Sequence, residues 1–208
     1  MKEVCINEKI KLSEHLASPS EAALSQMSEL NGVRLSPHFS LRECCKTKHK
    51  TADGNIPSHV AIENLKNICE GWLEDLRYSY NMLYGEEPAA ATREGQSPCA
   101  LQAAHTGDSP CVSPSEVPVI ITSGYRSPEV NRLAGGSPNS NHLTGCAVDI
   151  RCMGKEQMIR YAGILLDIAD GTRRNFDELI LEHRGSVCWL HFAVRPKENR
   201  RRISFDIK

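Results

Sequence analysis

The stretch Ser123–Asp149, SGYRSPEVNRLAGGSPNSNHLTGCAVD, is the part of the sequence around which the rest is organised. Near its end, His142 and Asp149 flank a short glycine-containing turn that leads into an apolar segment. An imidazole nitrogen and a carboxylate oxygen are ordinary zinc ligands, and a hydrolytic zinc site needs three protein ligands with a fourth position open for water. The spacing therefore predicts two metal ligands, and a third must come from another segment.

The third ligand is expected at His191, in the apolar segment 188–194. If residues 146–152 and 188–194 are neighbouring strands, their side chains alternate between two faces. Asp149 and His191 then stand opposite an apolar row on each strand, as expected for a sheet with one packed face and one face that carries a site. The apolar rows are Cys146, Val148, Ile150 and Cys152 on one strand, and Cys188, Leu190, Phe192 and Val194 on the other. A structural histidine and a turn-capping Asp149 are the alternative interpretation.

Three blocks follow one another in the chain: Ser123-Gly124-Tyr125-Arg126-Ser127, Ser140-x-His142-x-x-Gly145-x-Ala147-x-Asp149, and Trp189-x-His191. Together they resemble the zinc D-Ala-D-Ala carboxypeptidase family of peptidoglycan peptidases. The opening Leu35–Leu41 also resembles the start of that domain in short, phage-like members. The resemblance therefore covers about 35–208, with one interruption.

The resemblance implies a fold, a cofactor and a set of site residues. The fold is the Hedgehog/D-Ala-D-Ala-peptidase fold, an α+β domain with a small antiparallel sheet packed on helices. Arg126 would bind the substrate carboxylate or the developing oxyanion, a role that suits a forked guanidinium, although a surface salt bridge is the alternative. Zn²⁺ would be held by His142, Asp149 and His191, and the substrate would be contacted by Ser140, Tyr125 and Trp189.

The general base departs from the pattern of the resembled family. Many members carry a catalytic Glu three residues before the last zinc ligand, and others a His five residues before it, but this chain has Cys188 and Ser186 there. We expect the base at Glu182, because it ends an apolar run just before a turn that leads back into the next strand. His183 is the second candidate for the base. The alternative to a catalytic role is that Glu182 only forms an ion pair with a nearby arginine.

The function implied by the resemblance is hydrolysis of peptide bonds in the stem peptides of bacterial peptidoglycan, by a carboxypeptidase or an endopeptidase. Two alternatives belong to other classes. One is a catalytically inactive, zinc-bearing binding module, which the missing Glu at position 188 favours. The other is a phage tail protein or another particle component, in which the domain contacts the cell wall and catalysis is incidental.

Composition narrows the partners and the compartment. A net charge of −1 gives no long-range field to attract nucleic acid or an anionic membrane. The nine cysteines are odd in number and form no C-x-x-C motif, which suits reduced, buried thiols inside a cell. The first residues lack the apolar segment of a secretory signal, and no run of 18 apolar residues follows. We expect a monomer without stable membrane insertion, cytoplasmic as synthesised, that acts on the cell wall after release.

The chain is expected to form one main domain. Residues 1–34 are predicted to be a loosely ordered N-terminal extension, and residues 35–208 the zinc peptidase-like domain. A low-complexity insertion at about 86–116 contains the near repeat GQSPC and GDSPC. The basic segment 195–202 is expected to be a solvated face, with a contact to an acidic glycan or partner as the alternative.

Local patterns predict the remaining elements. A capping box at Ser40-x-x-Glu43 predicts a short helix, and a strand is expected at 117–122, buried on both faces. A long helix is expected from Ser58 to about Tyr80, with its apolar residues in one stripe. A third helix begins at Pro128, carries Asn131, and should fix the Arg126 loop; a fourth covers Lys155–Ala169, with Asp170-Gly171 as its stop.

Overall fold

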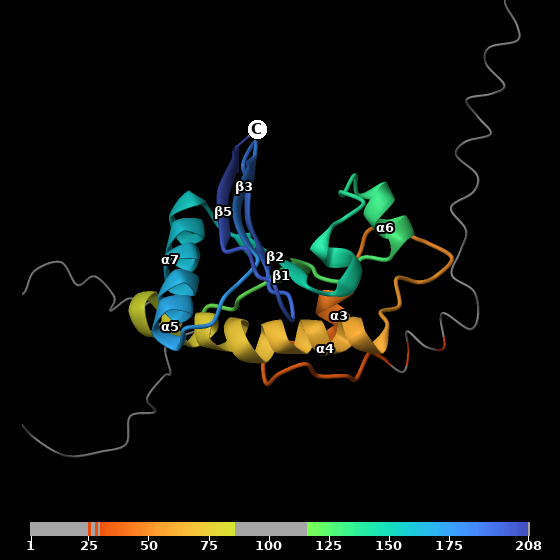
Figure 1. The fold of residues 1–208 in the computed structure, drawn as a ribbon, viewed down its shortest axis with the longest axis horizontal. Coiled ribbons are helices and arrows are strands. Elements are labelled where there is room, and N and C mark those ends of the chain that lie inside the picture. Colours follow the sequence, from red (N-terminus) through yellow and green to blue (C-terminus); the bar gives the residue numbers. More distant parts are fainter. Residues whose placement is uncertain (1–24, 26–27, 29, 86–115, 208) are drawn as a thin grey trace, which may run out of the picture.

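A computed structural model describes residues 25, 28, 30–85 and 116–207 of the chain, so most of the predicted extension and insertion lies outside the described residues. A five-stranded sheet in the order β1-β2-β4-β3-β5 packs on helices, which confirms the α+β class (Figure 1). Neighbouring strands are antiparallel except β3 and β5, which run parallel, so the sheet is mixed and not purely antiparallel. The strands are β1 (Ile121–Ser123), β2 (Ala147–Cys152), β3 (Glu178–Arg184), β4 (Val187–Ala193) and β5 (Arg202–Ile207).

A long helical rod lies along one end of the sheet and consists of α4 (His59–Ile68), the π-helical turn η1 (Cys69–Leu73) and α5 (Glu74–Tyr84) (Figure 1). It begins as predicted, because the Ser58 side chain accepts a hydrogen bond from the backbone of the first turn. It continues one turn beyond the predicted end. The widened turn contains Gly71, and the Gly71 carbonyl accepts a hydrogen bond from the Arg174 guanidinium. The π-helical turn therefore coincides with a contact from a side chain outside the helix.

The predicted apolar stripe of this rod is buried in the core. Its residues are Ala61, Leu65, Ile68, Trp72, Leu76 and Tyr80. The Trp72 ring packs edge-on against Phe192 of β4, with 5.2 Å between ring centroids, and against Phe176 at 6.4 Å. Each large apolar side chain buried in this way contributes about 1.5–3 kcal/mol of transfer free energy. The rod therefore anchors the packed face of the strands that carry the predicted ligands.

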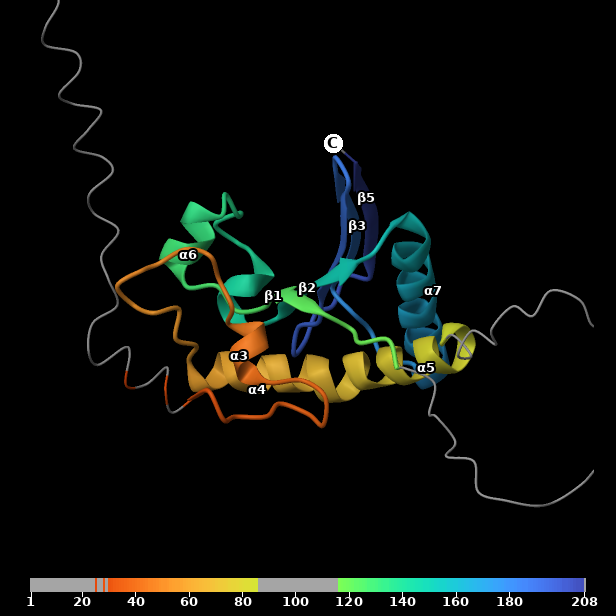
Figure 2. The ribbon, with the colours of Figure 1, turned by 180° about the vertical axis from the view of Figure 1, so that it is seen from behind.

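The helix α7 (Lys155–Thr172) packs against α5 and the sheet, and in both views it lies on the side away from α6 (Figures 1 and 2). It passes through the predicted stop at Gly171 and ends at Arg173, which takes the left-handed conformation with φ 56°. On its outer face Ile159 is 61% exposed, whereas Tyr161 is buried in the core. Among the described residues, no helix is long and apolar enough to cross a membrane.

Three short helical segments lie near the site face. They are α3 (Leu41–Cys44), α6 (Pro128–Leu133) and the 3₁₀ turn η2 (Asn141–Thr144). The capping box before α3 is complete, since Ser40 accepts from the Glu43 amide and the Glu43 carboxylate accepts from the Ser40 amide. The cap before α6 is also as predicted, with Ser127 at the N-cap and proline at the first helical position.

One strand differs from its prediction, and another was not predicted. Of the strand expected at 117–122 only the last two residues are regular, β1 continues to Ser123, and Ile120 is 41% exposed, because β1 is an edge strand with one covered face. At the other edge, β5 begins at the end of the basic segment 195–202 and pairs with β3. The alternation Ile203-x-Phe205 in the sequence was the signal for this strand. Most of the basic segment is exposed, as expected, and the half-exposed Arg200 also pairs with buried Asp177.

Candidate metal centre

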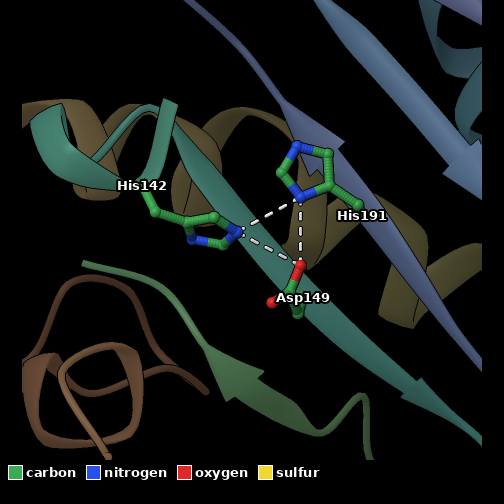
Figure 3. Close-up of side chains that lie close together, drawn as sticks. All are labelled: His142, Asp149 and His191. Atoms are coloured by element: carbon green, nitrogen blue, oxygen red, sulfur yellow. Dashed lines mark hydrogen bonds and ion pairs between the residues drawn. The ribbon is translucent and has the colours of Figure 1, made fainter. Parts of the chain in front are cut away.

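His142, Asp149 and His191 meet at one point on the site face of the sheet (Figure 3). His142 Nε2 lies 3.2 Å from Asp149 Oδ1 and 3.2 Å from His191 Nδ1, and His191 Nδ1 lies 3.0 Å from Asp149 Oδ1. All three side chains are buried. Within the described part of the chain, they form the one group of histidines, cysteines and acids that is close enough to hold a metal ion.

The pairing of β2 with β4 brings two of these side chains together. The register is regular and places Asp149 directly opposite His191. The Val194 amide donates to the Cys146 carbonyl at 2.9 Å, which makes these two residues a hydrogen-bonded pair. Because pair types alternate along an antiparallel ladder, Asp149 and His191 form a non-hydrogen-bonded pair, in which facing side chains are closer. The strands thus bring two of the proposed ligands together at one register position.

The third side chain comes from the turn η2, just before β2. The Ser140 hydroxyl accepts a hydrogen bond from the His142 amide at 3.3 Å and so caps the turn. Gly145 ends it with φ 70°, and a Cβ at this position would lie 2.3 Å from the Ala61 carbonyl oxygen of α4. The turn therefore requires glycine for its conformation and for its close approach to the helical rod.

The orientation of each imidazole ring is set by a partner behind it. His142 Nδ1 lies 2.5 Å from the Gly124 carbonyl oxygen, so Nδ1 carries the proton and Nε2 faces the centre. His191 has the opposite arrangement, since its Nε2 lies 3.6 Å from Glu178 Oε2 and its Nδ1 faces the centre. Partners of this kind fix the tautomer and the ring plane of metal-binding histidines.

The three groups fit a metal ion. Two imidazole nitrogens and a carboxylate oxygen are a common zinc donor set, with ligand distances of about 2.0–2.1 Å. A tetrahedral ion with such distances separates its ligand atoms by about 3.3–3.4 Å. The observed separations of 3.0–3.2 Å among His142, Asp149 and His191 are close to that value. The spacing is therefore that of three corners of a coordination tetrahedron.

The charges at the centre are strongly coupled. Burial alone would raise the pKa of the Asp149 carboxyl, but His142 and His191 hold it well below its usual range. Burial lowers the pKa of His142. Burial also opposes the charged form of His191, yet the Asp149 and Glu178 carboxylates, which accept from or pair with its two ring nitrogens, raise its pKa to about 9. In the absence of a metal, His191 is therefore protonated at neutral pH, and metal binding would displace that proton.

A cavity of about 350 Å³ opens beside the centre. Several predicted site residues line it: Arg126, Ser140, Glu182 and Trp189, together with the three proposed ligands. The Arg126 guanidinium donates through Nε to Ser123 Oγ at 2.8 Å and through Nη2 to Asp149 Oδ2. The expected alternative for Arg126, a surface salt bridge, does not describe this pair, because the two side chains are only 18% and 10% exposed.

Glu182 lies on the site face and His183 does not. In the register of β3 and β4, Glu182 faces Trp189 and His183 faces Cys188, whose side chain is in the core. Burial and the nearby Asp149 charge raise the pKa of the half-buried Glu182 carboxyl. His183 is not among the residues that line the cavity, so the second candidate for the base lies on the wrong face of the sheet.

Tyr125 also lies away from the cavity. Its side chain is 9% exposed and belongs to the hydrophobic core, which raises the pKa of its hydroxyl. The prediction that it contacts the substrate therefore finds no support in its placement. Its backbone, in contrast, belongs to the loop that holds Arg126 and His142.

Glu178 is a residue of the site that the sequence analysis missed. Besides His191, it contacts Asn141 Nδ2 at 3.1 Å and Arg200 Nη2 at 3.0 Å. The alternation Glu178-x-Ile180-x-Glu182 would have placed it on the same face as Glu182. Its role as the partner of His191 depends on the pairing of β3 with β4, which no local pattern reveals.

A comparison with known families agrees with this geometry, although no curated protein matches the chain significantly. Residues 113–171 match the family model described as Peptidase M15. The matched range contains Arg126, His142 and Asp149 and ends before His191. M15 peptidases are metal-dependent hydrolases, and the buried His-Asp-His group could bind the metal. Over residues 113–171 the chain is therefore similar to the peptidase M15 family, and this range includes two of the three residues of the candidate metal centre.

Proposed function

We propose that this protein is a zinc-dependent peptidase that hydrolyses peptide bonds in the stem peptides of bacterial peptidoglycan, as a D-Ala-D-Ala carboxypeptidase or an endopeptidase. The observation that carries the proposal is the convergence of His142, Asp149 and His191 beside a cavity that contains a carboxylate and a guanidinium. The partial match to the peptidase M15 model supports the same class of reaction.

The side chains around the cavity suit amide hydrolysis. When bound, a zinc ion supplies a Lewis acid that polarises the scissile carbonyl and generates a nucleophile at neutral pH. Glu182 would accept the proton of the attacking water and pass it to the leaving amine, and its raised pKa favours this exchange. Arg126 would donate to the substrate carboxylate or to the developing oxyanion. Ser140 would hydrogen-bond the stem peptide, and the partly buried Trp189 ring would pack against it.

The test is metal content together with product analysis. We expect about one zinc per chain in the wild type, and the loss of zinc in His142→Ala, Asp149→Ala and His191→Ala, because each variant removes one of three ligands. His183→Ala is the matched control and should keep its zinc, because His183 lies outside the cavity lining. Mass spectrometry of defined muropeptides after incubation identifies the bond that is cut. Equal zinc content in wild type and His191→Ala would contradict the ligand assignment.

A catalytically inactive, metal-bearing binding module is the second candidate. It is favoured by Cys188, because the residue three positions before His191 is a core thiol and not a catalytic acid. Under this alternative, the wild type holds zinc and sediments with purified cell-wall sacculi, but releases no product from any stem peptide. The same muropeptide assay therefore separates the two functions.

A further inference from the structure

Asn55 makes an unusual set of contacts for a loop residue. It lies between α3 and α4, outside the range that matches the family model, and its side chain is only 2% exposed. Its Nδ2 donates to the Cys45 carbonyl at 2.9 Å and to the Tyr125 carbonyl at 3.2 Å, and its Oδ1 accepts from the Ser127 amide at 2.7 Å. One side chain thus binds the backbone on both sides of Arg126.

The segment held by Asn55 touches the metal centre at two points. The Gly124 carbonyl accepts the hydrogen bond that fixes the His142 ring, and the Arg126 side chain pairs with Asp149. In addition, the Arg126 amide donates to the His142 carbonyl at 3.0 Å. A shift of residues 124–127 would therefore move the groups that orient two of the three proposed ligands.

A second contact shows that the end of α3 also supports this segment. The Tyr125 amide donates to the Cys44 carbonyl at 2.8 Å, and a Cβ on Gly124 would lie 2.5 Å from the Cys44 carbonyl oxygen. The backbone of 124–127 thus lies directly against the segment that ends α3. Asn55 connects the same two segments, because its amide group reaches both Cys45 and Tyr125.

The side chain of Asn55, and not its backbone conformation, explains why asparagine stands here. Asn55 has φ 54°, a conformation that glycine adopts more easily and asparagine tolerates. The Asp53 carboxylate accepts from the Asn55 amide at 3.0 Å and holds the turn in place. If the turn alone mattered, glycine would serve equally well, but glycine cannot make the contacts to Tyr125 and Ser127.

We infer that Asn55 is a positioning residue of the metal centre, which acts through the backbone of residues 125–127 to hold Arg126 and His142 in place. The inference rests on the proposed metal site. It does not depend on which peptide bond is cleaved. It also assigns a role to the loop between α3 and α4, a part of the chain that the family match leaves without one.

The decisive variant is Asn55→Gly, because glycine suits the left-handed backbone and removes only the side-chain contacts. Loss of a group that supports a metal ligand typically lowers metal affinity by about 10–100-fold. We expect a loss of that size for zinc in a chelator competition, and a changed visible absorption spectrum for the Co²⁺-loaded protein. Asn55→Asp keeps the acceptor for the Ser127 amide but places a carboxylate oxygen against the Cys45 and Tyr125 carbonyl oxygens, so it should lose at least as much affinity as Asn55→Gly.

Asn81 of α5 provides a matched control. Its side chain makes three hydrogen bonds of the same kind: Nδ2 donates to the carbonyls of Arg77 at 2.8 Å and Val117 at 3.1 Å, and Oδ1 accepts from the Val117 amide at 2.7 Å. Asn81 is not among the residues that line the cavity. Asn81→Ala should lower the Tm and leave zinc affinity and the Co²⁺ spectrum unchanged.

The inference is overturned if Asn55→Gly binds zinc with wild-type affinity and gives the wild-type Co²⁺ spectrum, or if Asn81→Ala loses affinity to the same extent. If both Asn55 variants unfold where Asn81→Ala stays folded, Asn55 supports the whole fold and the specific role is wrong. If the wild type binds neither Zn²⁺ nor Co²⁺, the proposed metal site is wrong. The positioning role of Asn55 is then tested by the ¹⁵N–¹H spectrum of the His142 ring in the metal-free protein. Asn55→Gly should change that spectrum and Asn81→Ala should not; no change in Asn55→Gly overturns the inference. Peptidase activity is a separate readout, so its absence counts only against the proposed function.

Discussion

At the scale of single residues, the β3–β4 hairpin carries a proposed catalytic residue on one face and core residues on the other. Glu182 of β3 faces the cavity beside Trp189, whereas Cys188 of β4 is 3% exposed and lies among core side chains. The resembled family often has its catalytic acid at the position of Cys188, so we expect the neighbouring strand to supply a replacement carboxylate through Glu182. The two residues therefore predict opposite effects when each is changed.

Glu182→Gln should keep zinc bound while turnover of a defined muropeptide falls by roughly 10²–10⁴-fold, because glutamine keeps the size but cannot accept a proton. Cys188→Ala should change turnover little and lower the free energy of unfolding by about 1 kcal/mol, through the loss of buried volume. Parallel assays of hydrolysis, zinc content and urea unfolding check both expectations. Near-full activity in Glu182→Gln would show that another group transfers the proton.

At the scale of elements, α5 and the chain before β1 are connected directly. The Asn81 side chain binds the backbone of Val117 at two points, and Arg77 forms an ion pair with Glu116. These contacts therefore hold α5 against residues 116 and 117, where the proposed insertion ends. The segment that connects α5 to the chain before β1 therefore needs no particular length to keep these contacts.

We expect the fold to survive replacement of residues 87–115 by a short Gly/Ser linker. The free energy of closing a loop grows slowly with its length, and the contacts of Asn81 and Arg77 remain in the shortened chain. Cooperative thermal unfolding and unchanged zinc content would agree with this prediction. A non-cooperative transition in the deletion variant would mean that the proposed insertion contributes to the core.

At the scale of the whole molecule, Asp177 joins the C-terminal segment to the site. Its fully buried carboxylate accepts hydrogen bonds from Arg200 Nε at 2.8 Å and Nη2 at 2.6 Å, and from Asn141 Nδ2 at 2.8 Å. Burial alone would raise the pKa of Asp177, but these donors outweigh it and lower the pKa to about 2. Because Asn141 directly precedes His142, the pairing links the last strand to the turn that carries a proposed ligand.

This pairing predicts a stability that depends on pH. The pKa of Asp177 is lower in the folded chain than in the unfolded chain, so its ionisation stabilises the fold above pH ~4, and this contribution is lost as the pH falls toward 2. Arg200→Ala should lower the free energy of unfolding by about 1–3 kcal/mol at pH 7, since it leaves a buried carboxylate with fewer donors. The difference from wild type should shrink at pH 3.

Arg201→Ala is the control for this measurement, because Arg201 pairs with Asp170, whose side chain is 69% exposed. An exposed ion pair of this kind contributes about 0–1 kcal/mol to the free energy of unfolding. Urea unfolding of the three proteins at pH 7 and pH 3 checks the prediction. An Arg200→Ala effect of equal size at both pH values would show that the ionisation of Asp177 is not its source.

The sequence by itself determined the features that depend on neighbours along the chain. Alternation in 146–152 and 188–194 placed Asp149 and His191 on one face, and period-3.6 spacing identified the buried stripe that includes Trp72. Cap residues marked the starts of α3, α4 and α6. These signals are reliable because each is a property of a single strand, helix or turn. The same alternation would also have excluded His183 as the general base once Glu182 was placed on the site face, since adjacent residues of a strand face opposite sides of the sheet.

Only the tertiary structure decided which distant groups meet. The contact of Glu178 with His191, the burial of Tyr125 and the hold of Asn55 on the Arg126 loop all join residues that are far apart or packed in three dimensions. The helix with Asn131 was also expected to fix that loop; it begins directly after the loop, and the Asn131 side chain donates to the Ser137 carbonyl. A local pattern fixes the face on which a side chain stands, whereas its partner is fixed by strand order, register and packing, which depend on the whole fold.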